Sequence, residues 1–304
     1  MVKKLLAMLM LLCLLPVFSL AEGEFPVLNA SGFLDTGEFL YENENAGVWR
    51  YCSPTLKVEV IRHVETSPKQ TYFVAEVWSD GTDTFFCCPA DWKKWAKATA
   101  YPARIAKDNR LVLAINGDYY HERSGKNRGI IVRNYDIVND KTYVRGYDKY
   151  PNLDTLSLFA NGFMMVNYSD TYTAQQLLDM GARDVLSFGP ILIKDGEYGE
   201  NIEKYGKSIA PRTAIGMVEY GHYFCVMYEG RHNNATGVSV KQLAEKMMEL
   251  GCTQAMNLDG GNTSGIVFMG KQLNVVGEDG VARNINCRKQ SDVVAIGHSD
   301  LCAQ

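Results

Sequence analysis

Short hydrophobic runs alternate with polar turns along most of this chain, and the pattern predicts a protein built mainly from strands. Runs rich in β-branched and aromatic residues that are bounded by Gly, Asn, Asp or Pro are typical of β-strands. Strands are predicted at residues 56–61, 72–78, 111–115, 155–160, 163–167, 213–218, 223–228, 255–258, 266–269 and 292–297.

Two segments follow a helical period instead. Residues 173–176 and 239–242 each place Ser or Thr three residues before Gln, which is the spacing of a capping box. The two helices are predicted to end at Gly181 and Gly251. The second carries an apolar stripe on one side, which indicates a surface facing the core and is formed by Val240, Leu243, Ala244, Met247 and Leu250.

Many strands with few helices predict an α+β fold, with a mixed β-sheet and flanking helices in a single large domain over residues 101–304. Residues 22–100 are predicted to be an N-terminal extension with strands that packs on this domain. Each helix is followed by a strand and then by a turn that contains glycine; the two turns lie at residues 188–190 and 258–260. These units suggest a weak internal repeat; the alternative is a coincidence between two generic helix–strand units.

The N-terminus has the features of a secretory signal peptide over residues 1–21. Two lysines precede an apolar run at residues 5–17, and Ser-Leu-Ala at residues 19–21 gives a small-x-small cleavage signal. The apolar run is too short to span a bilayer, which disfavours a membrane anchor. Bulky leucines before Cys13 disfavour a lipoprotein. We therefore expect a secreted or cell-envelope protein that begins at Glu22 and has no membrane span.

Composition and charge indicate which kinds of partner the protein is expected to bind. The chain has 304 residues, of which 46% are hydrophobic and 22% charged, as in ordinary globular proteins. Cleavage after residue 21 removes two lysines and no acids, so the net charge changes from −4 to −6. A mildly acidic protein without a basic patch is a poor nucleic-acid binder, so no nucleic-acid partner is expected.

Seven of the eight cysteines remain after this cleavage. In an exported protein, some are expected to form disulfide bonds, and the odd number leaves at least one thiol over. Cys225 and Cys252 lie in apolar runs and are alternatively interpreted as buried small hydrophobic residues.

Candidate chemistry gathers where predicted strands begin or end. Asp259 follows the apolar run at 255–258 and precedes Gly260 and Gly261. Asn116 follows the run at 111–115, and Arg212 comes directly before the strand at 213–218. Polar residues held at strand ends by a rigid scaffold are a frequent basis of active sites.

This set of motifs resembles the phosphodiester glycosidase family. The resemblance rests on Asn-Gly at residues 116–117, Ser-Phe-Gly-Pro at 187–190 followed by Asp-Gly at 195–196, Pro-Arg-Thr-Ala-Ile-Gly at 211–216, and Leu-Asp-Gly-Gly at 258–261, and it covers roughly residues 105–298. It implies a hydrolase that cleaves the bond from a sugar C1 to a phosphate oxygen, without a cofactor.

The resemblance also implies roles for individual residues. Asp259 is the carboxylate that stabilises an oxocarbenium-like state or attacks C1. Arg212 offers a planar fork to phosphate oxygens, although a structural ion pair is the alternative. Asn116 suits a sugar hydroxyl or N-acetyl group, although it is alternatively a turn residue.

Several positions depart from the family pattern. Glu229 stands where aspartate is usual and is the best second catalytic carboxylate; Arg231 supplies a second cation. Asp118 stands where glycine is usual, and an exposed turn residue is favoured over an extra site acid. His232 is either a proton carrier or a solvated loop residue. The candidate substrate-binding set is Arg212, Arg231, Asp118, Gly260, Gly261, Thr263 and Ser264.

No nucleotide-binding loop, serine-hydrolase elbow or zinc-protease motif is present in the sequence. Oxygens of Asp118, Asn116 and Asp259 could hold a hard cation, but their spacing matches no recognised motif, and no metal is predicted. The preferred function is hydrolysis of sugar-1-phosphodiesters in envelope or exopolysaccharide glycans. The alternatives are an ordinary glycosidase on the same scaffold and a non-catalytic protein that binds or exports polysaccharide.

Overall fold

A computed structural model describes residues 23–94, 98–118, 129–141, 153–169, 171–205 and 207–302 of the chain. The predicted signal peptide lies outside these residues. Each of the ten predicted strands coincides with an observed strand, eight of them to within one residue at either end; the strands predicted at 56–61 and 72–78 are longer in the structure, at 56–66 and 69–79. The pattern of apolar positions therefore located the central strands correctly.

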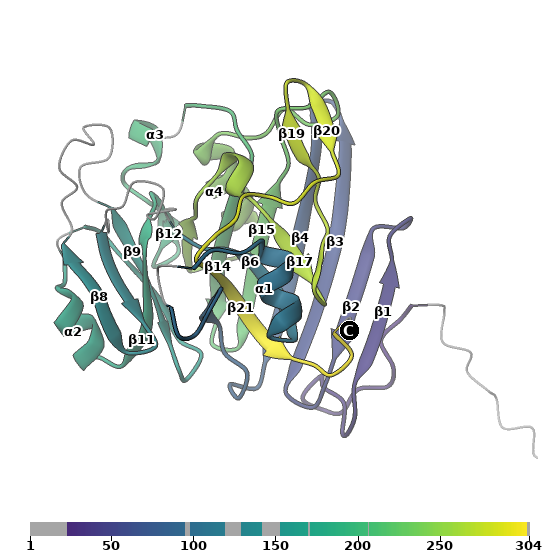
Figure 1. The fold of residues 1–304 in the computed structure, drawn as a ribbon, viewed down its shortest axis with the longest axis horizontal. Coiled ribbons are helices and arrows are strands. Elements are labelled where there is room, and N and C mark those ends of the chain that lie inside the picture. The colour runs from purple at the N-terminus through teal and green to yellow at the C-terminus, as the bar shows by residue number, and fades with distance from the viewer. Residues whose placement is uncertain are drawn as a thin grey trace, which may run out of the picture.

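The largest sheet has nine strands and forms the back of the molecule in Figure 1. Their order is β1 (Phe39–Asn43), β2 (Val48–Cys52), β3 (Leu56–Thr66), β4 (Lys69–Ser79), β15 (His222–Tyr228), β14 (Arg212–Glu219), β16 (Gln254–Asn257), β12 (Ile191–Lys194) and β13 (Glu197–Tyr198). Buried and partly buried residues alternate along β3, because only one face of the strand meets the core.

Two five-stranded sheets and a hairpin complete the fold. One sheet has the order β10 (Met164–Asn167), β9 (Asp154–Phe159), β11 (Ala182–Phe188), β7 (Gly129–Arg133) and β8 (Asp136–Lys141). The other has the order β18 (Lys271–Gln272), β17 (Ile266–Phe268), β6 (Leu111–Asn116), β21 (Asp292–His298) and β5 (Phe86–Pro89). The hairpin joins β19 (Val276–Glu278) to β20 (Val281–Arg283).

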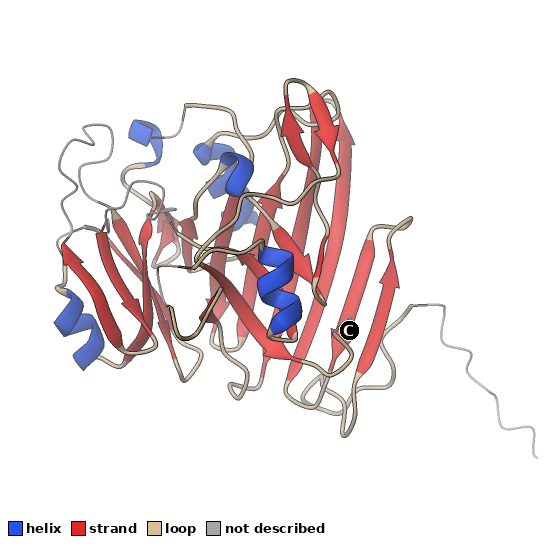
Figure 2. Ribbon diagram, viewed as in Figure 1, coloured by secondary structure: helices blue, strands red, loops and turns tan. Residues whose placement is uncertain are grey.

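The main hydrophobic core lies where the three large sheets meet, and it includes Phe73, Ile115, Leu156 and Met256. Short helices cover the outer faces (Figures 1 and 2). Helix α1 (Pro102–Asp108) packs on β6 and β21, α2 (Ala174–Asp179) on β11 and β8, and α4 (Val240–Glu249) on β12 and β14, with α3 (Ile202–Tyr205) beside it. Strand β6 is buried on both faces, which explains its unbroken apolar run.

The predicted α+β class with a mixed sheet needs correction, because the fold is richer in β-structure. The described residues contain only four short α-helices, and every ladder between their strands is antiparallel. The crossover through α4 does make β16 run parallel to β15, but β14 lies between them and pairs with both. The helix–strand rhythm was therefore real, while the expected parallel pairing was wrong.

The two suspected repeat units share one topology. In each, a hairpin is followed by a helix and a third strand that pairs with the first, giving the sheet orders β10–β9–β11 and β15–β14–β16. Both helices have complete capping boxes, at Thr173 and Ser239. The turns after the two third strands meet, since Gly189 N donates to Asn257 O at 3.1 Å and Asn257 Nδ2 donates back to Gly189 O at 2.8 Å.

The predicted boundary near residue 100 does not separate two structural units. Strand β4 pairs with β15 along its length, and β5 pairs with β21, so residues 22–100 supply strands to two of the main sheets. Strands β1 and β2 also form before residue 56, where no strand was predicted. Sequence patterns miss this integration, because pairing between distant strands leaves no local signal.

The expected disulfide bonds are not found among the described residues. All seven cysteines there are buried, and none of them is joined to another in a disulfide bond. The adjacent Cys87 and Cys88 belong to different hydrophobic clusters, because side chains alternate across β5. Burial of Cys225 and Cys252 confirms their interpretation as small core residues.

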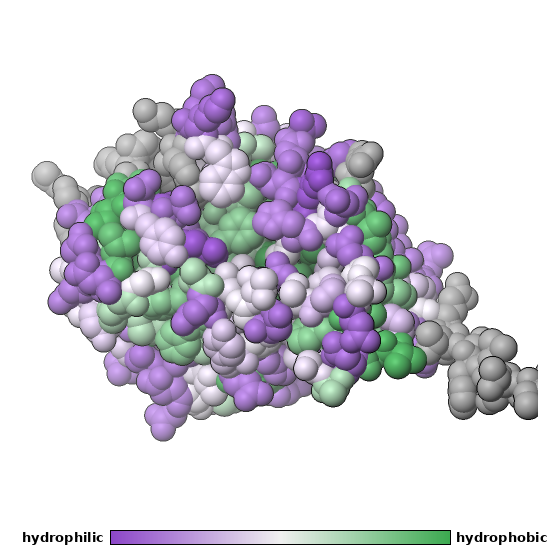
Figure 3. All heavy atoms as spheres, turned by 90° about the horizontal axis from the view of Figure 1, so that it is seen from below, coloured by the Kyte–Doolittle hydropathy of each residue, from purple (hydrophilic) through white to green (hydrophobic). Residues whose placement is uncertain are grey.

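The described surface carries no helix that is long and apolar enough to cross a membrane. In the view from below, hydrophobic side chains gather in separate groups among hydrophilic ones (Figure 3). Exposed hydrophobic residues distributed in this way are usual on the surface of a globular protein.

Candidate active site

Three of the predicted site residues lie at one edge of the nine-stranded sheet. Glu229 follows β15, Arg212 begins β14, and Asp259 comes shortly after β16, and these strands are neighbours in the order β15–β14–β16. The register pairs Arg212 with Tyr228 and Ala214 with Asn257, so the three ends coincide. The structure therefore brings together strand ends that the sequence identified separately.

Asn116 joins this edge from another sheet. Its Nδ2 donates to the main-chain oxygen of Asp259 at 2.8 Å, and its Oδ1 accepts from Gly265 N at 3.0 Å. The side chain is fully buried, and Nδ2 also contacts Gly117 O at 3.2 Å. Asn116 consequently fixes the loop that carries Asp259. A sugar contact, as the sequence predicted, would require one of these bonds to open.

The Asp259 carboxylate lies in a half-buried loop. Its Oδ1 accepts from Gly260 N at 2.9 Å, and the Thr263 side chain also hydrogen-bonds to it. Burial raises the pKa of Asp259 to about 6, and the negative charge of Asp118 adds to that rise. The hydrogen bonds from Thr263 and Gly260 and the positive charge of Arg288 oppose it. Asp259 therefore changes charge close to neutral pH, as carboxyl groups in active sites often do.

Arg288 was missed in the sequence. It lies between β20 and β21, where its Nη1 donates to Thr263 Oγ1 at 3.3 Å and its main-chain N donates to Asn262 O at 2.7 Å. Its positive charge favours the ionised form of Asp259. The surrounding polar run has no motif, so only the folding of this loop against residues 262–263 identifies Arg288 as part of the site.

Glu229 is 4% exposed, and its two carboxyl oxygens have separate partners. Val275 N donates to Oε1 at 2.8 Å, while Oε2 lies 3.2 Å from His232 Nε2. Burial raises the pKa of Glu229 to about 7, against the opposing effects of the Val275 bond and the Arg62 charge. Burial also lowers the pKa of His232, whose interpretation as a solvated loop residue is wrong.

A cleft of about 550 Å³ opens beside Glu229. Arg62 and Lys69 bring positive charge to it, and Glu44 and Glu65 bring negative charge. Its remaining lining residues are Val64, Thr66, Thr71, Phe73, Asn234, Gln272, Leu273, Val275 and Asn284. The buried carboxyl group of Glu229 is thus accessible to a polar space large enough for a sugar-sized ligand.

The two predicted phosphate-binding arginines have different surroundings. Arg212 Nη2 donates to Ser208 O at 2.8 Å, and its Nε donates to Val238 O at 3.3 Å. Arg231 is exposed, and its Nη1 donates to Asn262 Oδ1 at 3.3 Å. The Arg231 guanidinium lies so close to Gly261 that a Cβ there would come within 3.1 Å of it, and the Gly261 φ of +66° also favours glycine. Arg231 and the Asp259 loop therefore lie side by side.

The exposed-turn interpretation of Asp118 is wrong. Its side chain is buried and forms an ion pair with Arg133, whose Nη2 lies 2.9 Å from Asp118 Oδ1. This partner removes the reason for placing a cation there. No group of three or more His, Cys, Asp or Glu side chains in the described ranges is arranged to hold a metal ion.

The two hydroxyl residues after the glycines are both buried. Thr263 contacts Asp259 and Arg288, as described above. Ser264 Oγ is buried without a hydrogen-bond partner among the described residues. A direct contact of either hydroxyl with substrate stays a prediction.

The sequence model of the phosphodiester glycosidase family matches residues 109–294, a span that contains every predicted site residue and Arg288 but not the cleft-lining residues between 44 and 73. The chain belongs to the phosphodiester glycosidase family. The resemblance read from the motifs is thereby confirmed.

Solved structures agree with this family at the level of the fold. The catalytic domain of zebrafish N-acetylglucosamine-1-phosphodiester alpha-N-acetylglucosaminidase, auto-inhibited by its pro-peptide, matches with a TM-score of 0.62 and 18% identity over 86% of this chain and 88% of that one. A hypothetical protein from Synechocystis matches with a TM-score of 0.56 and 12% identity over 80% and 62%.

The chain is also similar to the SPbeta prophage-derived protein YomE of Bacillus subtilis (strain 168). It is 27% identical over 191 residues, which make up 60% of this chain and 28% of YomE. The chain therefore spans less than a third of the length of that relative.

Proposed function

We propose that this protein is an exported hydrolase that cleaves the C1–O bond of a sugar-1-phosphodiester in envelope or exopolysaccharide glycans. The observation that carries the proposal is the environment of Asp259: its carboxyl group lies at a sheet edge, is fixed by Asn116, and has a pKa raised to about 6. Family membership supplies the reaction class.

In the proposed reaction, ionised Asp259 stabilises positive charge developing at C1 or attacks that carbon. The C1–O bond breaks, the phosphate leaves with the bonding electrons and takes a proton from Glu229, and water finally delivers hydroxide to C1 and returns a proton to Glu229. Arg212, Arg231 and Arg288 all lie on segments next to the Asp259 loop. Their positive charge would favour an anionic leaving group.

Glu229 is the proposed proton-transfer group. Its raised pKa keeps the carboxyl group largely protonated up to about pH 7, while Asp259 is largely ionised above about pH 6. Two carboxyl groups with separated pKa values are a frequent division of acid and base roles.

The test compares kcat/KM for a phosphodiester and an alkyl or aryl glycoside of the same sugar. The proposal expects a clear preference for the phosphodiester, because a phosphomonoester leaves as a stable anion. Equal or better turnover of the alkyl glycoside would favour an ordinary glycosidase. Glycan binding without turnover of any sugar in a broad panel would favour a non-catalytic binding or export protein.

A further inference from the structure

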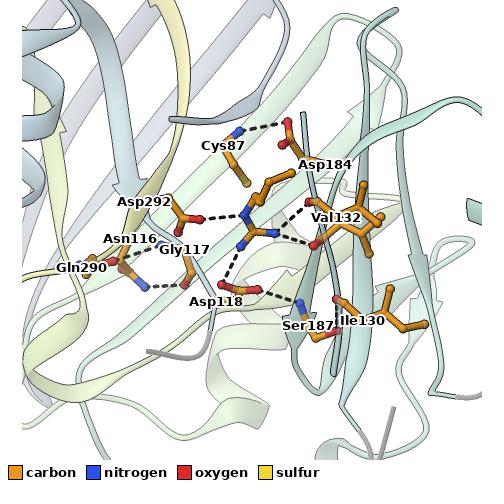
Figure 4. Close-up of polar contacts among 12 residues, drawn as sticks. Cys87, Asn116, Gly117, Asp118, Ile130, Val132, Asp184, Ser187, Gln290 and Asp292 are labelled. Atoms are coloured by element: carbon orange, nitrogen blue, oxygen red, sulfur yellow. Dashed lines mark hydrogen bonds and ion pairs between the residues drawn. The ribbon is translucent and has the colours of Figure 1, made fainter. Parts of the chain in front are cut away.

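A buried ion cluster lies next to the Asp259 loop and has no part in the chemistry described so far. Its centre is Arg133, at the end of β7, which is 2% exposed. Arg133 Nη2 lies 2.9 Å from Asp118 Oδ1, and Arg133 Nε lies 2.7 Å from Asp292 Oδ2. Figure 4 shows Asp118 and Asp292 turned toward this guanidinium from two sides. The cluster thus ties the sheet containing β7 to the sheet containing β6 and β21.

The cluster has further hydrogen bonds to the main chain. Arg133 Nη1 donates to Val185 O at 2.6 Å and to Val132 O at 3.1 Å, and Asp118 Oδ2 accepts from Ser187 N at 3.0 Å. Burying three charges has a large desolvation cost, so such a cluster is weak evidence for added stability. Its two acids and one base also leave one net negative charge inside the protein. The more direct consequence of the cluster is that it fixes the position of the backbone segments that carry its residues.

That backbone holds Asp259. Asp118 is the last of three consecutive residues, of which Asn116 donates to Asp259 O at 2.8 Å and Gly117 O faces Asp259 N at 3.4 Å. Gln290 secures the same segment, since its Oε1 accepts from Gly117 N at 3.4 Å and its Nε2 donates to Thr263 O at 3.2 Å. Segment 116–118 therefore contacts the Asp259 loop on one side and the ion cluster on the other.

We propose that Asp118, fixed by Arg133 and Ser187, is a positioning residue that holds segment 116–118 against Asp259 and places a fixed negative charge beside it. The inference rests on the proposed catalytic role of Asp259.

The groups facing Asp259 come from several elements. Thr263 and the Gly260 N–H hydrogen-bond to its carboxylate, and Arg288 supplies positive charge from the loop before β21. Asp118 is the negatively charged neighbour, from the end of β6, and Arg231 lies beyond Gly261 on the other side. Negative charge beside a carboxyl group favours its protonated form, so Asp118 raises the pKa of Asp259.

The experiment uses Asp118→Asn, which keeps the shape and an acceptor for Ser187 N but removes the charge. The titration of the Asp259 carboxyl group is followed by ¹³C NMR in the full-length protein, with Asp259→Asn used to assign the signal. We expect the Asp259 midpoint to fall by roughly one pH unit, the size typical of a nearby charge. The acid limb of the kcat profile is expected to move with it.

Asp292→Asn is the matched control. It removes the same charge from the same guanidinium, but from the β21 side, and it leaves Asp118 ionised beside Asp259. Asp292→Asn is expected to change thermal stability about as much as Asp118→Asn does. It is expected to change the titration midpoint of Asp259 clearly less than Asp118→Asn does. Equal shifts in the two variants would overturn the specific role of Asp118.

Arg133→Lys separates placement from charge. Lysine keeps the positive charge but lacks the fork that bonds two carboxylates. A loss of kcat of about tenfold or more, with a nearly unchanged Asp259 midpoint, is expected if geometry matters. An unchanged kcat in folded Arg133→Lys and an unchanged midpoint in Asp118→Asn would together refute the inference.

Failure of the proposed function gives a different result. If Asp259→Asn retained activity, Asp259 would lose its catalytic role, while the NMR titration would still show whether Asp118 controls its proton. Should Asp118→Asn fail to fold, the kcat and midpoint of Arg133→Lys decide the positioning claim.

Discussion

At the scale of single residues, the site contains two carboxyl groups, and burial raises the pKa of each toward neutral pH. Neither Asp259 nor Glu229 has a cation in direct contact among the contacts described above. Desolvation therefore dominates both pKa values, and each residue is poised to change charge near physiological pH.

Asp259→Asn should abolish hydrolysis while leaving the fold intact. The amide cannot stabilise positive charge at C1, so kcat should fall by roughly 10³-fold or more, as for loss of a dominant electrostatic group. Steady-state kinetics on a sugar-1-phosphodiester measures the effect, with circular dichroism as the folding control. Activity within about tenfold of the unmodified protein would remove Asp259 from the mechanism.

Arg212→Lys should be nearly as damaging as Arg212→Ala. The guanidinium donates in several directions at once, to Ser208 and Val238, and an ammonium group cannot keep this geometry while facing a phosphate. Comparison of kcat/KM for the two variants tests the point. Full activity of the lysine variant would mean that charge alone suffices at this position.

The pH dependence should be bell-shaped. Asp259 must be ionised, so activity should rise as pH increases through about 6. Glu229 must be protonated, so activity should fall as pH increases through about 7. Glu229→Gln should remove the alkaline limb of the kcat/KM profile; a limb that persists in this variant would assign the acid role elsewhere.

At the scale of elements, local sequence signals specified the helices well. The capping box of α4 formed as predicted: Ser239 Oγ accepts from Gln242 N at 3.2 Å, and Gln242 Oε1 accepts from Ser239 N at 2.9 Å. Both bonds join residues three apart, so the sequence contains all the information that they need. Helix α1 was not predicted, because its seven residues are too few for a clear apolar period.

Ser239→Ala should destabilise the protein by about 1 kcal/mol through loss of the cap, which corresponds to a fall in Tm of roughly 2–4 °C. Lys241→Ala, two residues further on, is the matched control: its exposed ion pair with Glu203 should contribute nothing measurable. Thermal unfolding of both variants tests this, and an equal loss in each would contradict the role of the cap.

At the scale of the whole molecule, three sheets enclose one core and bury every described cysteine. Burial raises the pKa of Cys88, Cys252 and Cys287 to about 12, so these thiols should be unreactive in the folded protein.

A reducing agent should therefore leave the thermal stability unchanged. A thiol reagent should label the cysteines only after unfolding, and counting labelled thiols by mass spectrometry before and after denaturation measures this. A clear fall in Tm on reduction, or fewer labelled thiols without prior reduction than with it, would reveal a disulfide bond and restore the expectation drawn from the signal peptide.

The sequence by itself determined the central strands, the capped ends of two helices and the family, because apolar periodicity, caps and glycine-rich turns act over a few residues. It also placed Arg212 and Asp259 at strand ends, although it did not show that these strand ends are neighbours. These features depend on local backbone preferences that each segment carries with it.

Only the tertiary structure decided the surroundings of the charged residues. Asp118 is buried rather than exposed because Arg133 reaches it, and Arg133 is in turn paired with Asp292, which lies 159 residues further along the chain. Glu229 contacts Val275, 46 residues further along the chain, and Arg288 contacts Thr263, 25 residues before it. Burial and charge pairing depend on every segment that surrounds a group, so the pKa of a carboxyl group and its role in the site emerge only when the sheets have assembled.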